Sequence, residues 1–338
     1  MESLSSLYSA ADQQSADRKR LLGQFFTIAN PFRSDAFQKW WKQANKQLGP
    51  SDCIIEPFAG ANNIVKLAAE IGVKRGWACY DITPPAENQV PTIPVSQRDT
   101  LREFPKGFKI AITNPPYLAK NSATRRGLQF PETSFEDLYQ VALDQMLANC
   151  GWVAAIIPAS FLTQRLMVER LSTVVALNCR MFDDTECPVC LALFTPEKKS
   201  DFLVYRGEEK LGSFSDLKGK LPDPRRQLPW RFNEPAGEIG LRALDGSVEA
   251  SIEFVTGDAI PSAKIDHTCR SITRIKMPPG IREHPATIIR SANRLLQEYR
   301  HKTHDVFMTA FKGLRRDGDY RRRLDFTQAR RLLDLAVS

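Results

Sequence analysis

Residues 108–117 read Phe-Lys-Ile-Ala-Ile-Thr-Asn-Pro-Pro-Tyr, an apolar run that ends in a short polar and aromatic segment. The run predicts a buried parallel strand, because strands covered on both faces are almost continuously hydrophobic. The last four residues, 114–117, then follow the carboxyl end of that strand. In open α/β sheets, ligands bind outside the carboxyl ends of the strands. We therefore expect an α/β fold with a ligand site at residues 114–117.

The tetrad at residues 114–117 is rich in hydrogen-bond acceptors. Pro115 and Pro116 fix two φ angles and remove two backbone N–H donors, so that carbonyl oxygens can point outward. Asn114 adds a side-chain oxygen, and Tyr117 adds a flat ring on which a planar group can stack. This combination suits a planar molecule with an exocyclic NH₂ group. A rigid turn between a strand and a loop is the alternative interpretation.

A strand–turn–helix unit precedes the tetrad. Residues 54–63 read Ile-Ile-Glu-Pro-Phe-Ala-Gly-Ala-Asn-Asn, and helical periodicity follows at residues 64, 67, 68 and 71. A glycine at the bend, Gly60, lets a ligand approach the backbone and the start of the helix. Residues 77–81 predict a further strand that closes on Asp81. An acid about 20 residues after such a turn typically binds ribose hydroxyls, so an adenosine-containing ligand is indicated.

These motifs resemble the S-adenosylmethionine-dependent amino-methyltransferases that modify adenine N6 in DNA, over roughly residues 20–200. The resemblance implies a Rossmann-like α/β methyltransferase core, S-adenosylmethionine as the cofactor and a smaller C-terminal target-recognition domain. Cofactor elements come first, the tetrad second and the recognition region last, which is similar to the γ arrangement. The family often has a second glycine where Asn62 stands. Because Asn tolerates left-handed backbone, we expect the turn to form.

The resemblance also implies a role for individual residues. An element before the glycine turn is similar to Gly-Gln-Phe-Phe-Thr at residues 23–27. Asp81 resembles the acid that binds the ribose, and Asp99 the acid that binds the adenine ring of the cofactor. The cofactor-binding residues implied are Thr27, Glu56, Phe58, Gly60, Asp81, Ile82, Asp99 and Asn114. The catalytic residues implied are Asn114, Pro115, Pro116, Tyr117 and Phe182. For Phe182, stacking on a flipped base and plain core packing are equally good interpretations.

The implied chemistry depends on fixed hydrogen-bond acceptors. An adenine amine is a poor nucleophile, because its lone pair is delocalised into the ring. Hydrogen bonds to the Asn114 side-chain oxygen and the Pro115 carbonyl favour its rehybridisation and stabilise the positive charge that develops on nitrogen. The base has to leave the duplex stack to be reached, and stacking on Tyr117 offsets part of that cost. No metal and no covalent nucleophile is required.

The C-terminal part of the chain is basic. From Lys264 to the end there are 17 Lys and Arg against 8 Asp and Glu, which gives this part a net charge of +9. The rest of the chain has a net charge of −1, since the whole chain has +8. This asymmetry indicates nucleic-acid binding. A solvated helical face is the alternative. The predicted DNA-binding residues are Arg315, Arg316, Arg321, Arg322 and Arg323.

A chain of 338 residues predicts two domains. A polar stretch at residues 196–201 suggests a catalytic, cofactor-binding domain at 1–200 and a basic DNA target-recognition region at 201–338. Residues 228–233 combine Trp230 and Phe232 with Arg231, and we favour an anchoring role for them over DNA contact. Alternating apolar residues from Val248 to Phe254 predict a strand.

Seven cysteines raise the question of a metal. Cys187 and Cys190 have zinc-knuckle spacing, but the sequence offers no second close pair to complete four ligands, so we expect no metal site. The sequence also shows no signal peptide and no apolar run long enough to span a membrane. With unpatterned cysteines, these features indicate a cytoplasmic protein.

The sequence therefore predicts a site-specific methyltransferase that acts on N6 of a flipped adenine in duplex DNA. It would belong to a restriction-modification system, with a cognate restriction endonuclease as functional partner, or act as an orphan enzyme. A methyltransferase acting on an RNA adenine or a protein glutamine amide is the alternative. A catalytically silent nucleic-acid-binding module is a third interpretation. The oligomeric state is not predicted.

Overall fold

The computed structural model describes residues 27, 29–164, 166–182, 186–266 and 268–337. The predicted element at residues 23–26 lies outside these ranges. The chain divides into two compact units, one formed by Met1–Phe161 and Arg165–Lys210, the other by Leu162–Gln164 and Leu211–Ser338. The catalytic and DNA-recognition roles of the two halves stay predictions.

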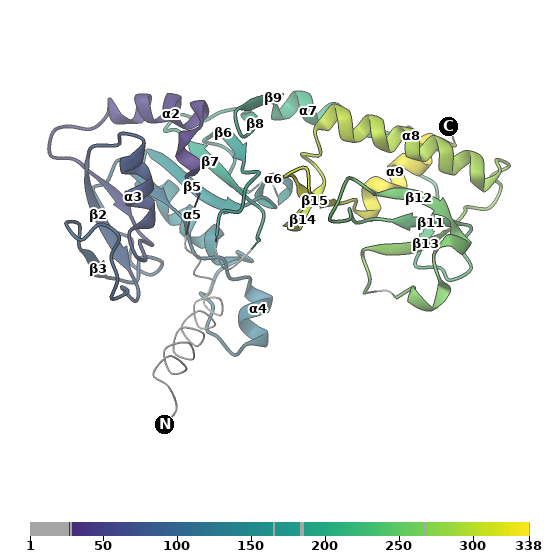
Figure 1. The fold of residues 1–338 in the computed structure, drawn as a ribbon, viewed down its shortest axis with the longest axis horizontal. Coiled ribbons are helices and arrows are strands. Elements are labelled where there is room, and N and C mark those ends of the chain that lie inside the picture. Colours follow the sequence, from purple (N-terminus) through teal and green to yellow (C-terminus); the bar gives the residue numbers. More distant parts are fainter. Residues whose placement is uncertain (1–26, 28, 165, 183–185, 267, 338) are drawn as a thin grey trace. The chain divides into compact units, whose positions relative to one another are not determined.

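A large, mostly parallel sheet forms the centre of the first unit (Figure 1). Its strand order in the described residues is β3-β2-β1-β4-β5-β7-β6-β8-β9, and β7 runs antiparallel between β5 and β6. The predicted Rossmann-like α/β fold is confirmed by this order. The strands are β1 (Cys53–Glu56), β2 (Gly76–Asp81), β3 (Val95–Gln97), β4 (Ile110–Thr113), β5 (Trp152–Pro158), β6 (Leu171–Ala176), β7 (Val189–Phe194), β8 (Leu203–Arg206) and β9 (Glu209–Ser213).

Helices cover both faces of this sheet. Helices α2 (Asp35–Asn45) and α3 (Asn63–Glu70) pack on the face that includes Ala154 and Ile156. The 3-10 helix η1 (Pro31–Arg33) packs on the same face. Alternate residues of β5 point to the opposite face, where α5 (Leu138–Asn149) packs against β5. All strand residues of β4 and β7 are buried, as their continuous apolar sequences predict.

Local sequence signals fix where the elements begin and end. Helix α5 begins at Leu138, because Asp137 accepts a hydrogen bond from the Tyr139 N–H and forms a capping box with Gln140. Strand β5 is an apolar run that is buried along almost its whole length. Helix α6 (Phe161–Gln164), which follows β5, is a single turn. A second short helix, α4 (Lys120–Arg125), follows the tetrad.

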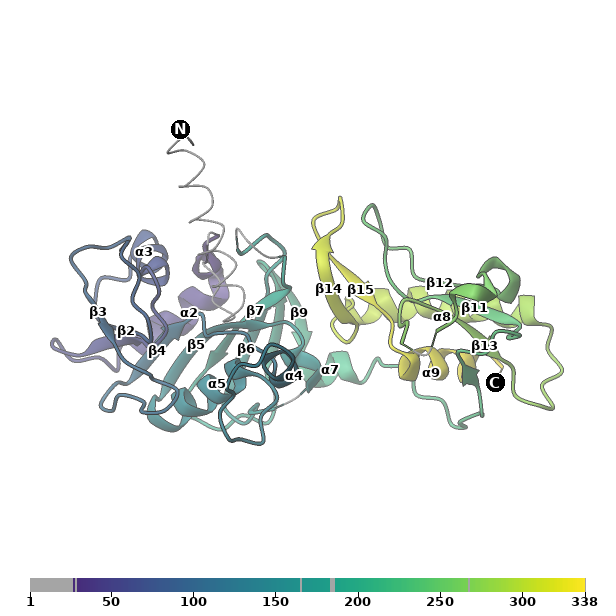
Figure 2. The same ribbon diagram turned by 90° about the horizontal axis from the view of Figure 1, so that it is seen from below.

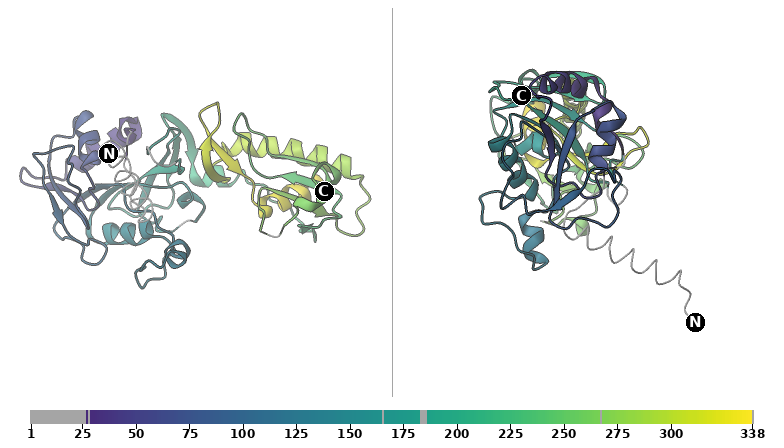
Figure 3. Two further views of the ribbon diagram at one scale, coloured as in Figure 1. Left: turned by 60° about the horizontal axis from the view of Figure 1, so that its bottom comes forward. Right: turned by 90° about the vertical axis from the view of Figure 1, so that its left-hand side faces the viewer.

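The second unit contains a four-stranded antiparallel sheet in the described residues, with the order β10-β13-β11-β12. Helices α8 and α9 share its core, and Figure 3 shows the long α8 beside the sheet. Strands β14 and β15 form a separate hairpin in the same unit (Figure 2). The elements are α7 (Phe214–Lys218), β10 (Arg231–Phe232), β11 (Ile239–Arg242), β12 (Glu253–Thr256), η2 (Gly257–Ala259), η3 (Ser262–Lys264), β13 (Ile272–Lys276), α8 (Pro285–Thr303), β14 (Thr309–Leu314), β15 (Tyr320–Arg323) and α9 (Phe326–Ala336).

Two sequence predictions for this unit have different outcomes. The anchoring role of residues 228–233 is confirmed, because Trp230 is buried and its indole N–H donates to Asp334 over 2.8 Å. The strand predicted from Val248 is wrong before residue 253. Val248 is half exposed, and the chain there forms a turn whose N–H groups are bound by the Asp245 carboxylate and Ser251. In the described part of the chain, no helix combines the length and the apolarity needed to cross a membrane.

Candidate active site

The predicted cofactor and catalytic residues of β1, β2 and β4 meet at one edge of the first sheet. The three strands are parallel neighbours, with Ile55 opposite both Ala78 and Ala111. Their carboxyl ends therefore lie side by side and carry Glu56, Asp81 and Asn114. These residues lie far apart in the sequence, and the parallel pairing of the three strands brings them together.

The turn after β1 is held open by two left-handed residues. Gly60 has φ 47°, and its N–H donates to the Asp81 carboxylate over 2.9 Å. Asn62 has φ 64° and ψ 27°, which confirms the expectation that this side chain tolerates the left-handed turn. Its amide nitrogen donates to Asn88 and to the Ile93 carbonyl. The turn thus links β1 directly to the end of β2.

Asp81 is a buried carboxylate whose oxygens can accept more hydrogen bonds than the protein donates to them. One oxygen accepts from Gly60, and the other accepts from the Thr83 N–H over 2.8 Å. Burial raises the pKa of Asp81, although the two backbone hydrogen bonds oppose the rise. Each oxygen has a further lone pair, so the group can accept from two neighbouring hydroxyls.

Glu56 is fully buried and has one oxygen without a hydrogen-bond partner among the described residues. Its Oε1 accepts from the Thr113 hydroxyl over 2.5 Å and from the Phe58 N–H over 3.0 Å, whereas Oε2 accepts from nothing. Burial raises the pKa of Glu56 to about 8, and these hydrogen bonds only partly oppose it. A buried acceptor of this kind is costly unless a ligand satisfies it.

Three further predicted cofactor residues lie near the same turn. Ile82 directly follows Asp81, and its side chain is 54% exposed, which is unusual for an isoleucine. The Thr100 hydroxyl donates to the Pro57 carbonyl over 2.8 Å and so holds the segment that carries Asp99 against the turn. Phe58 is half-buried in the turn itself. An apolar side chain, a ring and a carboxylate are thus available around one edge of the sheet.

In the tetrad, the phenol of Tyr117 contacts both Asn114 and β5. Its oxygen lies 2.5 Å from the Asn114 side-chain oxygen and 2.6 Å from the Ile156 carbonyl oxygen. Burial raises the pKa of Tyr117 well above its usual value, so the phenol stays protonated. The tetrad is therefore braced by the neighbouring strand, a contact that the sequence did not predict.

Phe182 and Tyr139 support the Tyr117 ring from two directions. The Phe182 ring meets it edge-on at 6.0 Å between centroids, and Tyr139 does so at 6.5 Å. Phe182 is fully buried, and its backbone forms a bridge with Thr27. Core packing is thus the arrangement observed for Phe182. The sequence does not identify Tyr139 and Thr113 as parts of the site, because their neighbours in space lie far away in the sequence.

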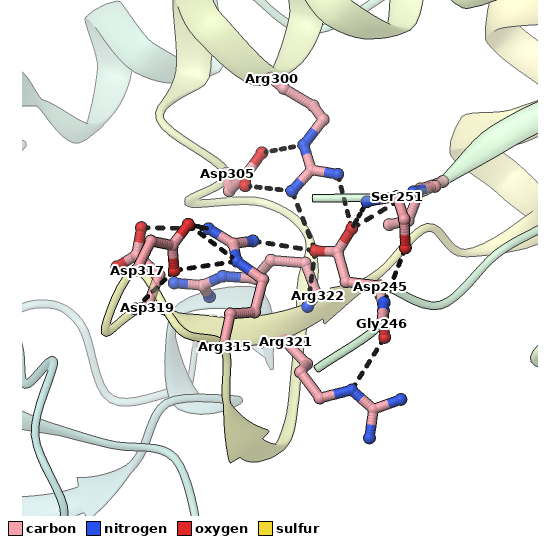
Figure 4. A network of polar contacts seen from close by, with 11 residues as sticks. Asp245, Gly246, Ser251, Arg300, Asp305, Arg315, Asp317, Asp319, Arg321 and Arg322 are labelled. Carbon is pink, nitrogen blue, oxygen red and sulfur yellow. Dashed lines mark hydrogen bonds and ion pairs between the residues drawn. The ribbon is translucent and has the colours of Figure 1, made fainter. Parts of the chain in front are cut away.

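The predicted DNA-binding arginines fall into two groups. Arg316 is exposed, and Arg321 and Arg323 are partly exposed. Arg315 and Arg322 are buried. Figure 4 shows the guanidinium of Arg315 among carboxylates, with hydrogen bonds of 3.0 Å to Asp245 and 2.9 Å to Asp317. The prediction for Arg315 is corrected accordingly, because its hydrogen-bonding groups are used inside the unit.

Asp245 is the centre of this network. Its buried carboxylate accepts two hydrogen bonds from Arg300, of 2.9 and 3.0 Å, and one from Arg315. The backbone N–H groups of Ser251 and Arg322 also donate to it. Burial alone would raise the pKa of Asp245, but the hydrogen bonds and charge of Arg300 hold it below its usual value. One carboxylate therefore joins α8, the hairpin and the turn after β11.

Within the described ranges, no three His, Cys, Asp or Glu side chains are grouped as they would be around a metal ion. Cys190 is buried in β7, and Cys187 lies just before that strand.

No protein-family model matches the chain, and no curated protein sequence matches it. Among solved structures, the chain is similar to the methyltransferase subunit of a type I restriction-modification system from Streptococcus thermophilus, with 17% identity over 53% of this chain and 46% of that one and a TM-score of 0.37. It is also similar to a chain of another type I restriction-modification system, with 18% identity over 60% and 49% of the two chains and a TM-score of 0.39. For a DrdV–DNA complex the identity is 13% over 58% and 28%, with a TM-score of 0.42. The chain spans less than half the length of each.

Proposed function

We propose that this protein is an S-adenosylmethionine-dependent DNA methyltransferase that acts on N6 of an adenine flipped out of duplex DNA. It would serve a restriction-modification system, with a cognate restriction endonuclease as functional partner, or act as an orphan enzyme. The observation that carries the proposal is the meeting of Glu56, Asp81 and the Asn-Pro-Pro-Tyr tetrad at one sheet edge. An acidic pair next to an acceptor-rich tetrad suits a cationic nucleoside and an amine.

The residues at this edge fit the cofactor. The Asp81 carboxylate can accept from both ribose hydroxyls, and the exposed Ile82 offers an apolar face to the adenine ring. The unsatisfied Oε2 of Glu56 suits a cationic donor such as an ammonium group. Asp99 supplies a further acceptor beside the turn. When bound, S-adenosylmethionine supplies an electrophilic methyl group on its sulfonium.

The tetrad would hold and activate the amine of the target base. The Asn114 side-chain oxygen and the Pro115 carbonyl accept hydrogen bonds from the amine and stabilise the positive charge that develops on nitrogen. Because both acceptors are fixed by the sheet and by the prolines, little reorganisation is needed during the reaction. A proton then leaves the methylated nitrogen for water. Unpaired acceptors would disfavour bases that lack this amine.

Tyr117 would receive the flipped base. Its ring is held by Phe182 and Tyr139, so its orientation is set before a base arrives. Stacking on such a ring contributes about 1–3 kcal/mol, which offsets the few kcal/mol needed to unstack a base. The partly exposed arginines of the second unit make duplex DNA the favoured substrate over a protein glutamine amide.

The test is methyl transfer from labelled S-adenosylmethionine to unmethylated duplex DNA, followed by digestion and identification of the nucleosides. We expect N6-methyladenine from the intact protein and none from the Asn114→Ala variant. Label in RNA or in a protein amide instead of DNA would contradict the choice of substrate. Binding of the cofactor without transfer to any acceptor would contradict the catalytic proposal.

A further inference from the structure

The β14–β15 hairpin has two different faces. Thr309 pairs with Arg323, and Leu314 pairs with Tyr320. Along β15 the burial alternates: Tyr320 and Arg322 are buried, whereas Arg321 and Arg323 are partly exposed. Alternation with a period of two means that Arg321 and Arg323 share the outward face.

The inward face is fixed by the Asp245 network. The Asp245 N–H donates to the Arg322 carbonyl, and the Arg322 N–H donates back to the Asp245 carboxylate. Arg315, at the turn of the hairpin, is held by the same carboxylate. The hairpin is therefore attached to the unit by buried charged groups, and its outward face is presented in a defined orientation.

The hairpin as a whole is cationic. Residues 309–323 include six Lys and Arg and two acids, Asp317 and Asp319, and both acids bond to Arg315. Among the described residues, Arg323 makes no side-chain hydrogen bond or ion pair, and Lys312 and Arg316 are exposed. Positive charge on the hairpin is thus left for a partner.

Arg321 is oriented without being neutralised. Its Nε donates to the Asp245 carbonyl over 2.8 Å, and its guanidinium lies over the Phe311 ring at 5.4 Å. Figure 4 shows the two terminal nitrogens of Arg321 pointing away from the Asp245 carboxylate. An arginine held in this way keeps its bidentate donor edge and loses little side-chain entropy on binding.

We infer that the β14–β15 hairpin enters the major groove of duplex DNA, with Arg321 and Arg323 contacting base edges and Lys312 and Arg316 contacting phosphates. The major groove admits a two-stranded ribbon, and the arginine fork fits the O6 and N7 acceptors of guanine. Arg315 and Arg322 form the framework and do not touch DNA. The inference rests on the proposed function, since it names the element that would select the target of the methyltransferase.

The test compares two double variants of the full-length protein. The first is Arg321→Ala with Arg323→Ala; the matched control is Arg290→Ala with Arg294→Ala, which removes the same charge from exposed positions on α8. We expect duplex affinity to fall roughly tenfold or more for the first pair and the salt slope to flatten by up to about 2, with little change in the control. Equal salt slopes for the two pairs would overturn the inference. So would tighter binding of single-stranded RNA than of duplex DNA by the intact protein.

A charge-preserving variant separates base reading from phosphate binding. Arg321→Lys with Arg323→Lys keeps the charge but loses the planar fork, so we expect an almost unchanged salt slope and a broader set of methylated sites in sequenced DNA. An unchanged set of sites would overturn the base-reading role. If the intact protein methylates no DNA but the alanine pair still loses duplex affinity, the proposed function fails and the DNA contact stands. Thermal unfolding of each variant shows whether the hairpin remains folded.

Discussion

The phenol oxygen of Tyr117 lies within hydrogen-bond distance of both the Asn114 side chain and the Ile156 carbonyl, at 2.5 and 2.6 Å. A phenol has one proton, and both of its partners are acceptor oxygens, so the proton is shared between Asn114 Oδ1 and the Ile156 carbonyl. The contact with Tyr117 uses only one lone pair of the Asn114 oxygen, and the other can accept from a substrate amine. Strand β5 would thus orient Asn114 through Tyr117.

The variant Tyr117→Phe keeps the ring and removes this orienting hydroxyl. We expect kcat for methyl transfer to fall about tenfold, which corresponds to about 1.4 kcal/mol of transition-state stabilisation, with an unchanged Kd for S-adenosylmethionine. The control is Tyr139→Phe, which removes a hydroxyl that accepts a hydrogen bond from the Gln140 amide over 3.4 Å. If Tyr117 acted by stacking alone, both variants would keep the rate of the intact protein.

Removal of the Asn114 amide tests the acceptor itself. We expect Asn114→Ala to lower turnover by roughly two to three orders of magnitude, by analogy with the loss of one hydrogen-bonding group at a developing charge. Cofactor affinity, measured by calorimetry, should change little. A turnover within a factor of about two of the intact protein is incompatible with the proposed mechanism.

Glu56→Gln should make the protein without cofactor more stable at neutral pH. The pKa of Glu56 is about 8 in the folded protein, whereas in the unfolded chain it has the usual value for glutamate. The folded state therefore binds the proton more tightly. That contribution to stability is complete below the unfolded pKa of about 4.5 and is lost as the pH rises through about 8. Glutamine removes the loss, so we expect a gain of about 2–4 kcal/mol at pH near 8 and little difference near pH 4.5. Urea unfolding at the two pH values measures it, and an equal effect at both contradicts the assignment.

Much of the first unit could be predicted from local sequence. The strand before Asn114, the turn at Gly60 and the acid at Asp81 each follow from patterns of about ten residues. The residues that hold Tyr117 in place could not be predicted in this way. Ile156 and Tyr139 reach Tyr117 because parallel pairing and helix packing bring separate segments together.

The basic C-terminal part shows the limit of composition more clearly. The sequence predicts five DNA-binding arginines, but it does not show that Arg315 has a carboxylate partner 70 positions earlier, at Asp245. Charge counting treats all arginines alike, whereas burial separates the framework residues from those that remain available. The strand predicted at Val248 failed for a related reason, because Asp245 binds the backbone of this segment as a turn.

Asp245→Asn should strongly destabilise the second unit. The substitution leaves two buried guanidinium groups, of Arg300 and Arg315, without their shared charge partner. Breaking a buried pair of this kind costs about 3–5 kcal/mol, because the fully buried counter-charge is lost and only the more exposed carboxylates of Asp305, Asp317 and Asp319 remain. Asp317→Asn is the matched control, since its side chain is 51% exposed and it bonds to the same Arg315, and we expect it to cost about 1 kcal/mol or less. Urea unfolding followed by circular dichroism measures both. The affinity for S-adenosylmethionine, whose proposed site lies in the first unit, should be unaffected in Asp245→Asn under conditions where the protein remains folded. Similar unfolding midpoints for the two variants would show that Asp245 is not the centre of the network.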